Sequence, residues 1–260
     1  SLIVGGMKGS EPRADLLVSM HHAVSDGGSL AIFAREVAEI YRALGDSHAT
    51  LPAAPRIQFV DFAAWQRTWL AGETLAAEVA HGVLRLRGLP EGVELPADHT
   101  RPPVLGSAGF VETLAIPFSD SAFAELGARS GATPFMVVLA LFSAWLERVS
   151  GAEDFAIGVP ADQRDRAELL PLIGFFVNTL AVRVQGTTDD SFLALLAHVR
   201  ASAIEAFLHR DLPFERLVAG LESIGTLRRD PSRSPIFQVL LSYEAAPPAP
   251  IALDGSLVAT

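Results

Sequence analysis

Residues 21–29 read HHAVSDGGS, and this stretch decides both the fold and the chemistry that we expect of the chain. It places His22 four residues before Asp26, with a second histidine directly before the pair and two glycines directly after it. Imidazole is the side chain best suited to proton transfer near neutral pH, and glycine lets a backbone N–H approach a substrate oxygen closely. An H-x-x-x-D spacing also occurs by chance, so histidines that only pack or cap a turn are the competing interpretation.

The sequence on either side places this motif at a turn between a strand and a helix. Residues 16–20 form a short apolar run typical of a strand, and residues 30–44 carry apolar side chains at helical spacing. Ser29 is the expected N-cap of that helix and Gly45 its expected end. Side chains on such a turn are held rigidly but stay accessible, as a functional site requires.

Farther along the chain, helical and strand-like patterns alternate, and we predict an α/β fold with mixed sheets. Helices are expected over residues 59–86, 120–130 and 191–208, and from Pro134 onward with Thr133 as N-cap. Strands are expected over residues 110–116, 155–159, 179–184 and 237–243, and strand-like alternation continues through 251–260. Residues 90–103 are rich in Pro, Gly and Asp and form the expected connector between two subdomains.

The composition excludes several classes of function. The formal net charge of −10 argues against nucleic-acid binding, which depends on Lys and Arg meeting phosphate. Because the chain has no cysteine, disulfides, thiolate-bound zinc and a cysteine nucleophile are excluded. The longest apolar run, residues 135–146, is much shorter than the roughly 20 residues that span a bilayer. We therefore expect a cytoplasmic protein with neither a nucleic acid nor a membrane as partner.

Seven segments together resemble one known family. Residues 21–29 are similar to the HHxxxDGxS core of condensation domains in nonribosomal peptide synthetases, and residues 173–183 (IGFFVNTLAVR) resemble the IGxFVNTLxxR segment of that family. The other similar segments follow in the family's order: VDFAAWQ (60–66), ELPADHTRP (94–102), GVPADQR (158–164), HRDLPFE (209–215) and RDPSRSP (229–235). Three positions depart from the pattern, with Gly82 for a common Trp, Arg210 for Gln and Ser234 for Asn.

The resemblance implies a chloramphenicol-acetyltransferase-like fold of two similar subdomains in a V, with the active site in a tunnel between them. Residues 1–103 then correspond to the remaining part of the N-terminal subdomain, including the HHxxxDG motif and the connector. Residues 104–260 correspond to an incomplete C-terminal subdomain. On this comparison the chain is an internal fragment, truncated at both ends.

The resemblance also implies a reaction. The amine of an acceptor aminoacyl group attacks the thioester carbonyl of a donor peptidyl group, and a peptide bond forms. Both groups arrive on phosphopantetheine arms of donor and acceptor peptidyl carrier proteins, and an adjacent adenylation domain is a further partner. No metal or soluble cofactor is expected to bind the chain directly.

The roles of individual residues follow from the same resemblance. His22 orients the amine and takes its proton, the Gly27 N–H helps to hold the oxyanion, and Asp26 pairs with an arginine to keep the turn rigid. Arg164 is the favoured partner of Asp26 and Arg183 the second choice. The supporting residues are His21, Arg164, Asn178 and Arg183, with Asn178 expected beside the tunnel.

Related activities remain as alternatives. Epimerization domains usually carry E-G-H-G-R where this chain has residues 158–164, and heterocyclization domains replace the histidine pair with Asp. Residues 29–41 (SLAIFAREVAEIY) are more similar to domains that take an L-configured donor. A coenzyme A-dependent acyltransferase and a non-catalytic carrier-protein docking module are the two other candidates; the intact His22, Asp26 and Gly27 argue against degeneration.

Overall fold

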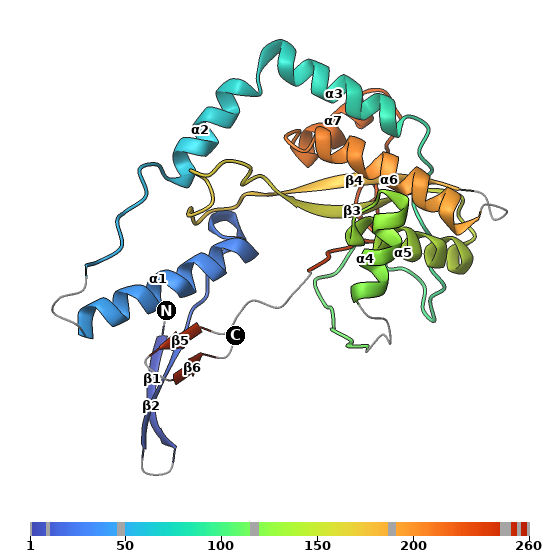
Figure 1. Ribbon diagram of the computed structural model, residues 1–260. Coiled ribbons are helices and arrows are strands. Elements are labelled where there is room, and N and C mark those ends of the chain that lie inside the picture. The colour runs from blue at the N-terminus through green and yellow to red at the C-terminus, as the bar shows by residue number, and fades with distance from the viewer. Residues whose placement is uncertain are drawn as a thin grey trace. The chain divides into compact units, whose positions relative to one another are not determined.

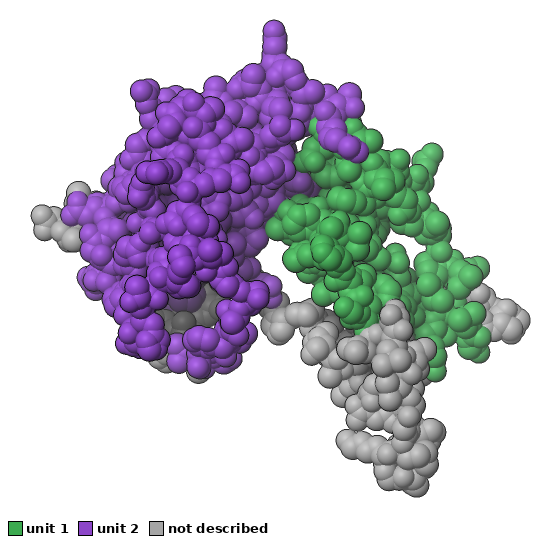
Figure 2. Space-filling model, turned by 180° about the vertical axis from the view of Figure 1, so that it is seen from behind, with its two compact units in different colours: residues 1–66, 164–177, 246–260 green, residues 67–163, 178–245 purple. Residues whose placement is uncertain are grey.

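The computed structural model describes residues 2–8, 11–45, 50–114, 120–186, 191–244, 251–253 and 256–258. The chain divides into two compact units (Figure 2). Unit 1 comprises residues 1–66, 164–177 and 246–260, and unit 2 comprises residues 67–163 and 178–245. This division by packing differs from the expected boundary after residue 103. The partition into two related subdomains at that point stays a prediction.

Unit 1 is built around one long helix (Figure 1). Its elements are β1 (Leu2–Lys8), β2 (Glu11–Leu17), the 3-10 turn η1 (His22–Val24), α1 (Gly27–Gly45), the first part of α2 (Phe59–Trp69), β5 (Ile251–Leu253) and β6 (Ser256–Val258). Strands β1 and β2 pair antiparallel, as do β5 and β6, and β5 lies along α1. The strand expected over residues 16–20 ends at Leu17, so the three residues after it already belong to the turn.

The start of α1 corrects the prediction of its N-cap. The helix begins at Gly27, and the carbonyl of Asp26 accepts the first intrahelical bond from the Leu30 N–H. The Asp26 carboxylate accepts from the Ser29 N–H at 2.8 Å, which is the side-chain bond of an N-cap. Asp26 is therefore the cap, and Ser29 is the third helical residue. The predicted end of the helix at Gly45 is confirmed.

The core of unit 1 holds the segment that links β3 to β4 along the chain. Phe62 of α2 packs with Leu169, Leu172 and the fully buried Phe176. The Phe176 ring lies 4.9 Å from the Phe62 ring and 5.0 Å from the Phe59 ring. Aromatic pairs at these separations add to the free energy of burial. The backbone around Phe176 is thereby anchored to α2.

Unit 2 contains most of the apolar core. Its elements are α3 (Gly72–Leu86), α4 (Asp120–Ser130), α5 (Pro134–Ser150), β3 (Asp154–Asp162), β4 (Val177–Gln185), α6 (Phe192–Leu208) and α7 (Phe214–Ser223). Strands β3 and β4 form a two-stranded sheet, and helices α4, α5 and α6 pack together. The predicted cap of α5 is confirmed, because Thr133 accepts from the Met136 N–H. Ser191, the expected first residue of the next helix, is the N-cap of α6 and accepts from the Ala194 N–H.

Several predicted elements differ from the structure. The helix expected over residues 59–86 is two helices, broken at Leu70 and Ala71 before Gly72, whose φ is +55°. The strand expected over residues 237–243 is reduced to one parallel bridge between Gly158 and Leu240. Of the strand expected over residues 110–116, residues 110–114 form no strand, and residues 115–116 lie outside the described chain. Of the strand-like stretch at residues 251–260, residues 254–255 and 259–260 also lie outside it. Helix α7 was not predicted.

The apolar helix α5 is a core helix, as predicted: its buried residues include Val137, Leu139 and Leu146. Over the described ranges, no single helix has the length and apolar composition needed to cross a membrane. Only the pair Ser121–Ser130 and Pro134–Ser150 passes that test jointly, and the two are bent by 95°.

Two glycines set the distance between α3 and α7. A Cβ built on Gly220 would lie 2.7 Å from Val79 Cγ1 and 2.9 Å from Val83 Cγ2. A Cβ on Gly82 would lie 2.8 Å from Leu217 Cδ1 and 3.2 Å from Leu212 Cδ2, so leucine side chains already occupy the space beside this glycine. Contacts this short leave no room for a methyl group unless one helix moves.

We predict that Gly220→Ala destabilises the protein although alanine is the better helix former. Overpacking costs about 1–3 kcal/mol, against a gain in helix propensity of at most about 1 kcal/mol. The net loss, about 1 kcal/mol in the free energy of unfolding, is measurable by urea denaturation. Gly106→Ala is the matched control, because a Cβ there meets no atom within 4 Å. Equal stability of the two variants would contradict the close α3–α7 packing.

Candidate active site

One hydrogen bond of the His22 imidazole determines which ring nitrogen is left free. Its Nδ1 lies 2.7 Å from the backbone carbonyl oxygen of Ser25. A carbonyl oxygen can only accept, so Nδ1 carries the proton and donates it to this bond. In the neutral ring the lone pair then resides on Nε2. The side chain is exposed, so the structure presents an accessible basic nitrogen, which is what a general base requires.

His21 is held in the opposite tautomer. Its Nδ1 accepts from the Ala23 N–H at 3.0 Å, so the proton of the neutral ring is on Nε2. This bond caps the short turn η1, and the Ser25 hydroxyl donates to the His21 carbonyl at 3.3 Å. The two adjacent histidines therefore have different functions in the turn. His21 shapes it, and His22 presents its free nitrogen.

A buried ion pair lies beneath this turn. Arg164 donates through Nη1 to Asp26 Oδ2 at 2.9 Å and through Nη2 to Oδ1 at 2.8 Å. The Asp26 side chain is 0% exposed and that of Arg164 is 4% exposed. The guanidinium also stacks 4.2 Å above the centre of the Phe176 ring. The predicted pairing of Asp26 with Arg164 is confirmed, and the second choice, Arg183, is not its partner.

Ser29 is the centre of the network around this pair, a larger function than the capping expected from its position in the sequence. Its Oγ lies 2.7 Å from Asp26 Oδ1, 3.0 Å from Arg164 Nη2, and 2.8 and 3.0 Å from the carbonyl oxygen and N–H of Gly174. The Phe176 N–H adds a bond of 2.9 Å to Asp26 Oδ2. The signal was available, because Ser29 is the last residue of the HHxxxDGxS pattern.

The protonation of Asp26 depends on these bonds. Burial by itself raises the pKa of the Asp26 carboxyl, because it penalises the charged form. Hydrogen bonds from Arg164, Ser29 and the Phe176 N–H together outweigh burial, so the pKa of Asp26 lies below its ordinary value. The carboxylate is thus ionised at neutral pH and points at Arg164, which makes it a structural group in the turn.

The two glycines after Asp26 differ in their surroundings. Both occupy the first turn of α1, where N–H groups have no intrahelical acceptor and the helix dipole favours negative charge. A Cβ on Gly27 would meet nothing within 4 Å, whereas one on Gly28 would lie 3.1 Å from Arg164 Nη1. Open space beside Gly27 suits the approach of an oxyanion. Gly28 lets the guanidinium come close.

Asn178 belongs to unit 2, and its side-chain amide forms hydrogen bonds with backbone groups there. Its Nδ2 donates to the carbonyls of Arg210 and Leu212, both at 2.7 Å, and its Oδ1 accepts from the Phe214 N–H at 3.3 Å. These bonds fix the turn that leads into α7. The geometry therefore favours a structural function for Asn178 over substrate contact.

Arg183 also supports unit 2. It donates to both carboxylate oxygens of Asp154, at 2.8 and 2.6 Å. It further donates to the carbonyls of Arg85 and Arg87 at the C-terminal end of α3, at 3.0 and 2.9 Å. Of the seven predicted site residues, His21, His22, Asp26, Gly27 and Arg164 thus gather in unit 1, and Asn178 and Arg183 serve the frame of unit 2.

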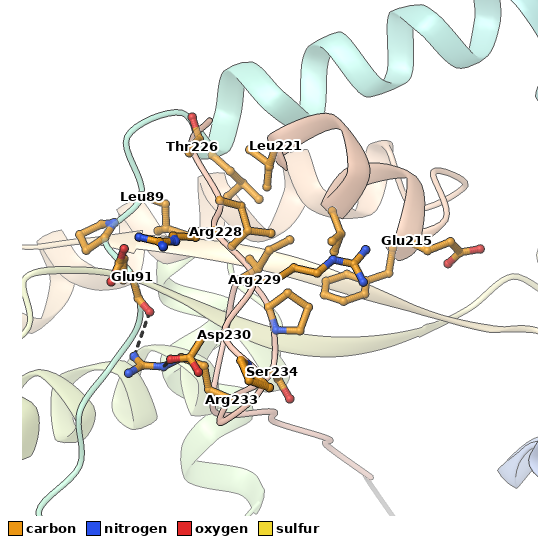
Figure 3. Close-up of a pocket in the computed structure, with 18 residues that line it drawn as sticks. Leu89, Glu91, Glu215, Leu221, Thr226, Arg228, Arg229, Asp230, Arg233 and Ser234 are labelled. Carbon is orange, nitrogen blue, oxygen red and sulfur yellow. Dashed lines mark hydrogen bonds and ion pairs between the residues drawn. The ribbon is translucent and has the colours of Figure 1, made fainter. Parts of the chain in front are cut away.

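Unit 2 also contains a cavity of about 820 Å³ between α7, the end of α3 and the loop at residues 226–236 (Figure 3). No predicted site residue lines it. Two of the arginines that line it are paired: Arg233 donates to Asp230 at 2.9 Å and to the Glu91 carbonyl at 3.3 Å, and Arg229 pairs with Glu222. Because none of the residues of the HHxxxDG turn lines this cavity, we place the active site at the His22 turn.

Within the described part of the chain, no group of three or more His, Asp or Glu side chains is arranged to hold a metal ion. At the His22 turn the titratable side chains are two adjacent histidines and one carboxylate, and Arg164 already pairs with that carboxylate.

Comparison with known proteins agrees with this geometry. The family model of the condensation domain matches residues 4–250. The chain belongs to the condensation domain family. This condensation domain is 42% identical over 229 residues to part of a linear gramicidin synthase from Brevibacillus parabrevis, covering 88% of the chain and 3% of that protein. It is also 42% identical over 231 residues to phosphinothricin tripeptide synthetase PhsC of Streptomyces viridochromogenes, covering 88% of the chain and 21% of that protein.

Solved structures show the same fold. The X-domain from teicoplanin biosynthesis superposes with a TM-score of 0.76 at 28% identity, covering 92% of this chain and 55% of that one. The first condensation domain of the calcium-dependent antibiotic synthetase gives a TM-score of 0.70 at 25% identity, covering 91% and 51%. The fold is thus the α/β, chloramphenicol-acetyltransferase-like fold of condensation domains, as predicted. The chain spans about half the length of these structures and a small part of the two synthetases.

We predict that Asp26→Asn destabilises the condensation domain by about 3–5 kcal/mol near neutral pH, because it leaves the buried Arg164 guanidinium without its counter-charge. Glu39→Gln in the same helix is the control, since the Arg35–Glu39 pair is exposed and its loss changes stability little. Urea denaturation measures both.

The pH dependence of that loss is a second test of the pair. The folded-state pKa of Asp26 is lowered, so the ionised carboxylate stabilises the folded protein fully above the unfolded pKa of about 3.9. This contribution to the free energy of unfolding disappears as the pH falls through the folded-state pKa. The stability difference between wild type and Asp26→Asn should stay constant near neutral pH and shrink in acid below about pH 4. A difference that is independent of pH down to the acid limit would contradict an ionised Asp26.

Proposed function

We propose that this condensation domain catalyses peptide-bond formation between two carrier-bound substrates, with His22 as the general base. One observation carries the proposal: the Nε2 lone pair of His22 is presented on an exposed turn that a buried ion pair holds rigid. The similarity to peptide synthetases supports the substrate class. The donor is then a peptidyl thioester and the acceptor an aminoacyl thioester.

The reaction balances with groups that the turn supplies. The acceptor amine attacks the donor carbonyl, and a C–N bond forms as the carbonyl oxygen gains the negative charge. His22 Nε2 takes a proton from the attacking nitrogen. The C–S bond then breaks, and the departing thiolate of the donor arm accepts this proton from His22, which returns to its neutral form. The N–H of Gly27 at the start of α1 stabilises the oxyanion, as helix N-termini do.

Two magnitudes indicate how much of the rate each effect supplies. General-base assistance contributes roughly 10²–10⁴ in rate, equivalent to about 3–5 kcal/mol. Holding two tethered reactants in line contributes about 7–11 kcal/mol. An α-amino group has a pKa near 8 and a thioester is already activated, so little proton chemistry is needed. Positioning is therefore the larger effect, and His22 accelerates a reaction that proximity already favours.

The partners follow from the same proposal. Donor and acceptor peptidyl carrier proteins present their substrates on phosphopantetheine arms, and an adenylation domain loads the acceptor. The similarity of residues 29–41 to domains with an L-configured donor supports an L donor here. We place the protein in the cytoplasm, where these substrates are made.

A second candidate function is a non-catalytic docking module. A complex of the X-domain and OxyB from teicoplanin biosynthesis has been solved, and that X-domain is 28% identical to this chain with a TM-score of 0.73. A protein with this fold can thus bind another protein. The His22 turn favours catalysis, because a docking surface has no need of a locked imidazole tautomer.

We predict that His22→Ala lowers the rate of peptide-bond formation about 10²–10⁴-fold while the protein stays folded. The natural full-length protein is mixed with donor and acceptor carrier proteins loaded with aminoacyl-pantetheine, and intact-mass spectrometry follows the dipeptidyl acceptor. His198→Ala, which removes an exposed histidine on α6, should leave the rate unchanged.

Other products in this assay would identify the alternatives. An epimerised donor or a coenzyme A transfer product would replace the proposed reaction with a related one. The absence of any product, together with binding of a carrier protein, would favour the docking module. A turnover of His22→Ala within a few-fold of wild type would remove His22 from the mechanism.

A further inference from the structure

Phe175 contacts the proposed base directly. Its ring centroid lies 5.0 Å from that of His22, and the two ring planes make an angle of 75°, an edge-to-face arrangement. This separation and angle are those of a favourable aromatic pair. The Phe175 side chain is 41% exposed, although the residues before and after it are buried.

The backbone on both sides of Phe175 is fixed by the buried network. The carbonyl oxygen and N–H of Gly174 both lie within 3.0 Å of Ser29 Oγ. The N–H of Phe176 donates to Asp26 Oδ2 at 2.9 Å, and the Phe176 ring is fully buried. Phe175 therefore extends from an anchored segment, and its ring reaches His22 with little backbone freedom.

His22 needs such a neighbour. The hydrogen bond from its Nδ1 to the Ser25 carbonyl holds one atom of an exposed ring. A ring held only at Nδ1 can still tilt about that hydrogen bond, and the tilt displaces Nε2, which lies across the ring from Nδ1. A second contact on the ring removes this motion. Misplacement of a catalytic group by about 1 Å costs up to about 100-fold in rate. A contact that restrains the His22 ring therefore affects the rate of the reaction.

We propose that Phe175 is the positioning residue of His22: with the Ser25 carbonyl, it holds the imidazole so that Nε2 points at the attacking amine. The proposal rests on the condensation activity proposed above. Residue 175 is a position that the IGxFVNTLxxR pattern leaves unspecified, so the pattern itself assigns no function to this side chain. It acts through His22 and takes no part in bond making.

The test is a pair of substitutions in two backgrounds, made in the natural full-length protein. Phe175→Ala should lower the single-turnover rate of dipeptidyl-acceptor formation about three- to tenfold, with the half-saturating carrier-protein concentration unchanged. Phe175→Tyr keeps the ring and should retain the wild-type rate within about twofold. Phe110→Ala removes a phenylalanine that is 87% exposed and is the matched control, with no expected effect.

The decisive measurement is the double variant. If Phe175 acts through His22, Phe175→Ala should cause no further loss in a His22→Ala background. An equal fold-loss in both backgrounds, or a wild-type rate for Phe175→Ala, would overturn the proposal. Thermal unfolding of each variant checks that the fold is kept.

A readout independent of activity separates this proposal from the proposed function. The ¹⁵N chemical shifts of the His22 ring distinguish a protonated from an unprotonated nitrogen. In wild type, neutral His22 should show protonated Nδ1 and unprotonated Nε2, and Phe175→Ala should keep this tautomer because the Ser25 carbonyl remains. NMR relaxation of the His22 ring Cε1–H should show a larger amplitude of ring motion in Phe175→Ala than in wild type. If no peptide bond forms but this change is seen, the positioning by Phe175 stands and the assigned reaction is wrong. If the amplitude of His22 ring motion is the same in Phe175→Ala and wild type, the positioning is wrong whatever the reaction.

Discussion

The ion pair between Asp26 and Arg164 is the interaction on which the rest of the site depends. It joins residues 138 positions apart in the sequence, so it ties the start of α1 to the segment between β3 and β4. Neither side chain reaches solvent, and the carboxylate accepts from Arg164, from the Ser29 N–H and hydroxyl, and from the Phe176 N–H. Burying two charges is costly unless every remaining polar atom is satisfied. Here the satisfied network makes the pair a rigid support rather than a source of large net stability.

This support explains why the reactive residue can be exposed. His22 must be accessible to two substrates, yet an exposed side chain on a short turn would ordinarily sample several rotamers. The structure separates the two requirements along the chain. Residues Ser25, Asp26 and Ser29 are buried and fixed, whereas His22, which precedes them, and Gly27, which lies between Asp26 and Ser29, are exposed. The same network fixes Gly174 and Phe176, and this places the ring of Phe175 against the imidazole of His22.

The sequence predicts those parts of this arrangement that follow from local capping rules or from the family motifs. The cap Thr133, the helix end at Gly45 and the Asp26–Arg164 pair are predicted correctly, because each follows from a local rule or a family pattern. Ser29 is the expected cap because serine is a common N-cap, but the helix begins two residues earlier, at Gly27, and the Asp26 carboxylate accepts the N–H of Ser29 itself. The break after Trp69 was missed because helical periodicity continues through it. The strand expected over residues 237–243 makes a single bridge, since alternation predicts a strand but not its partner.

The contact between Phe175 and His22 shows what a pattern cannot give. In IGxFVNTLxxR the residue is the unspecified one, and nothing in its type indicates a contact 153 positions earlier in the chain. Only the backbone geometry reveals it, because the residues on either side use their N–H and carbonyl groups to anchor the segment and leave the side chain of residue 175 to face the imidazole. A frame fixed by backbone bonds allows the side chain beside the base to vary without loss of the fold. Such a position can adjust the orientation of the base, and with it the rate, while the buried ion pair stays the same.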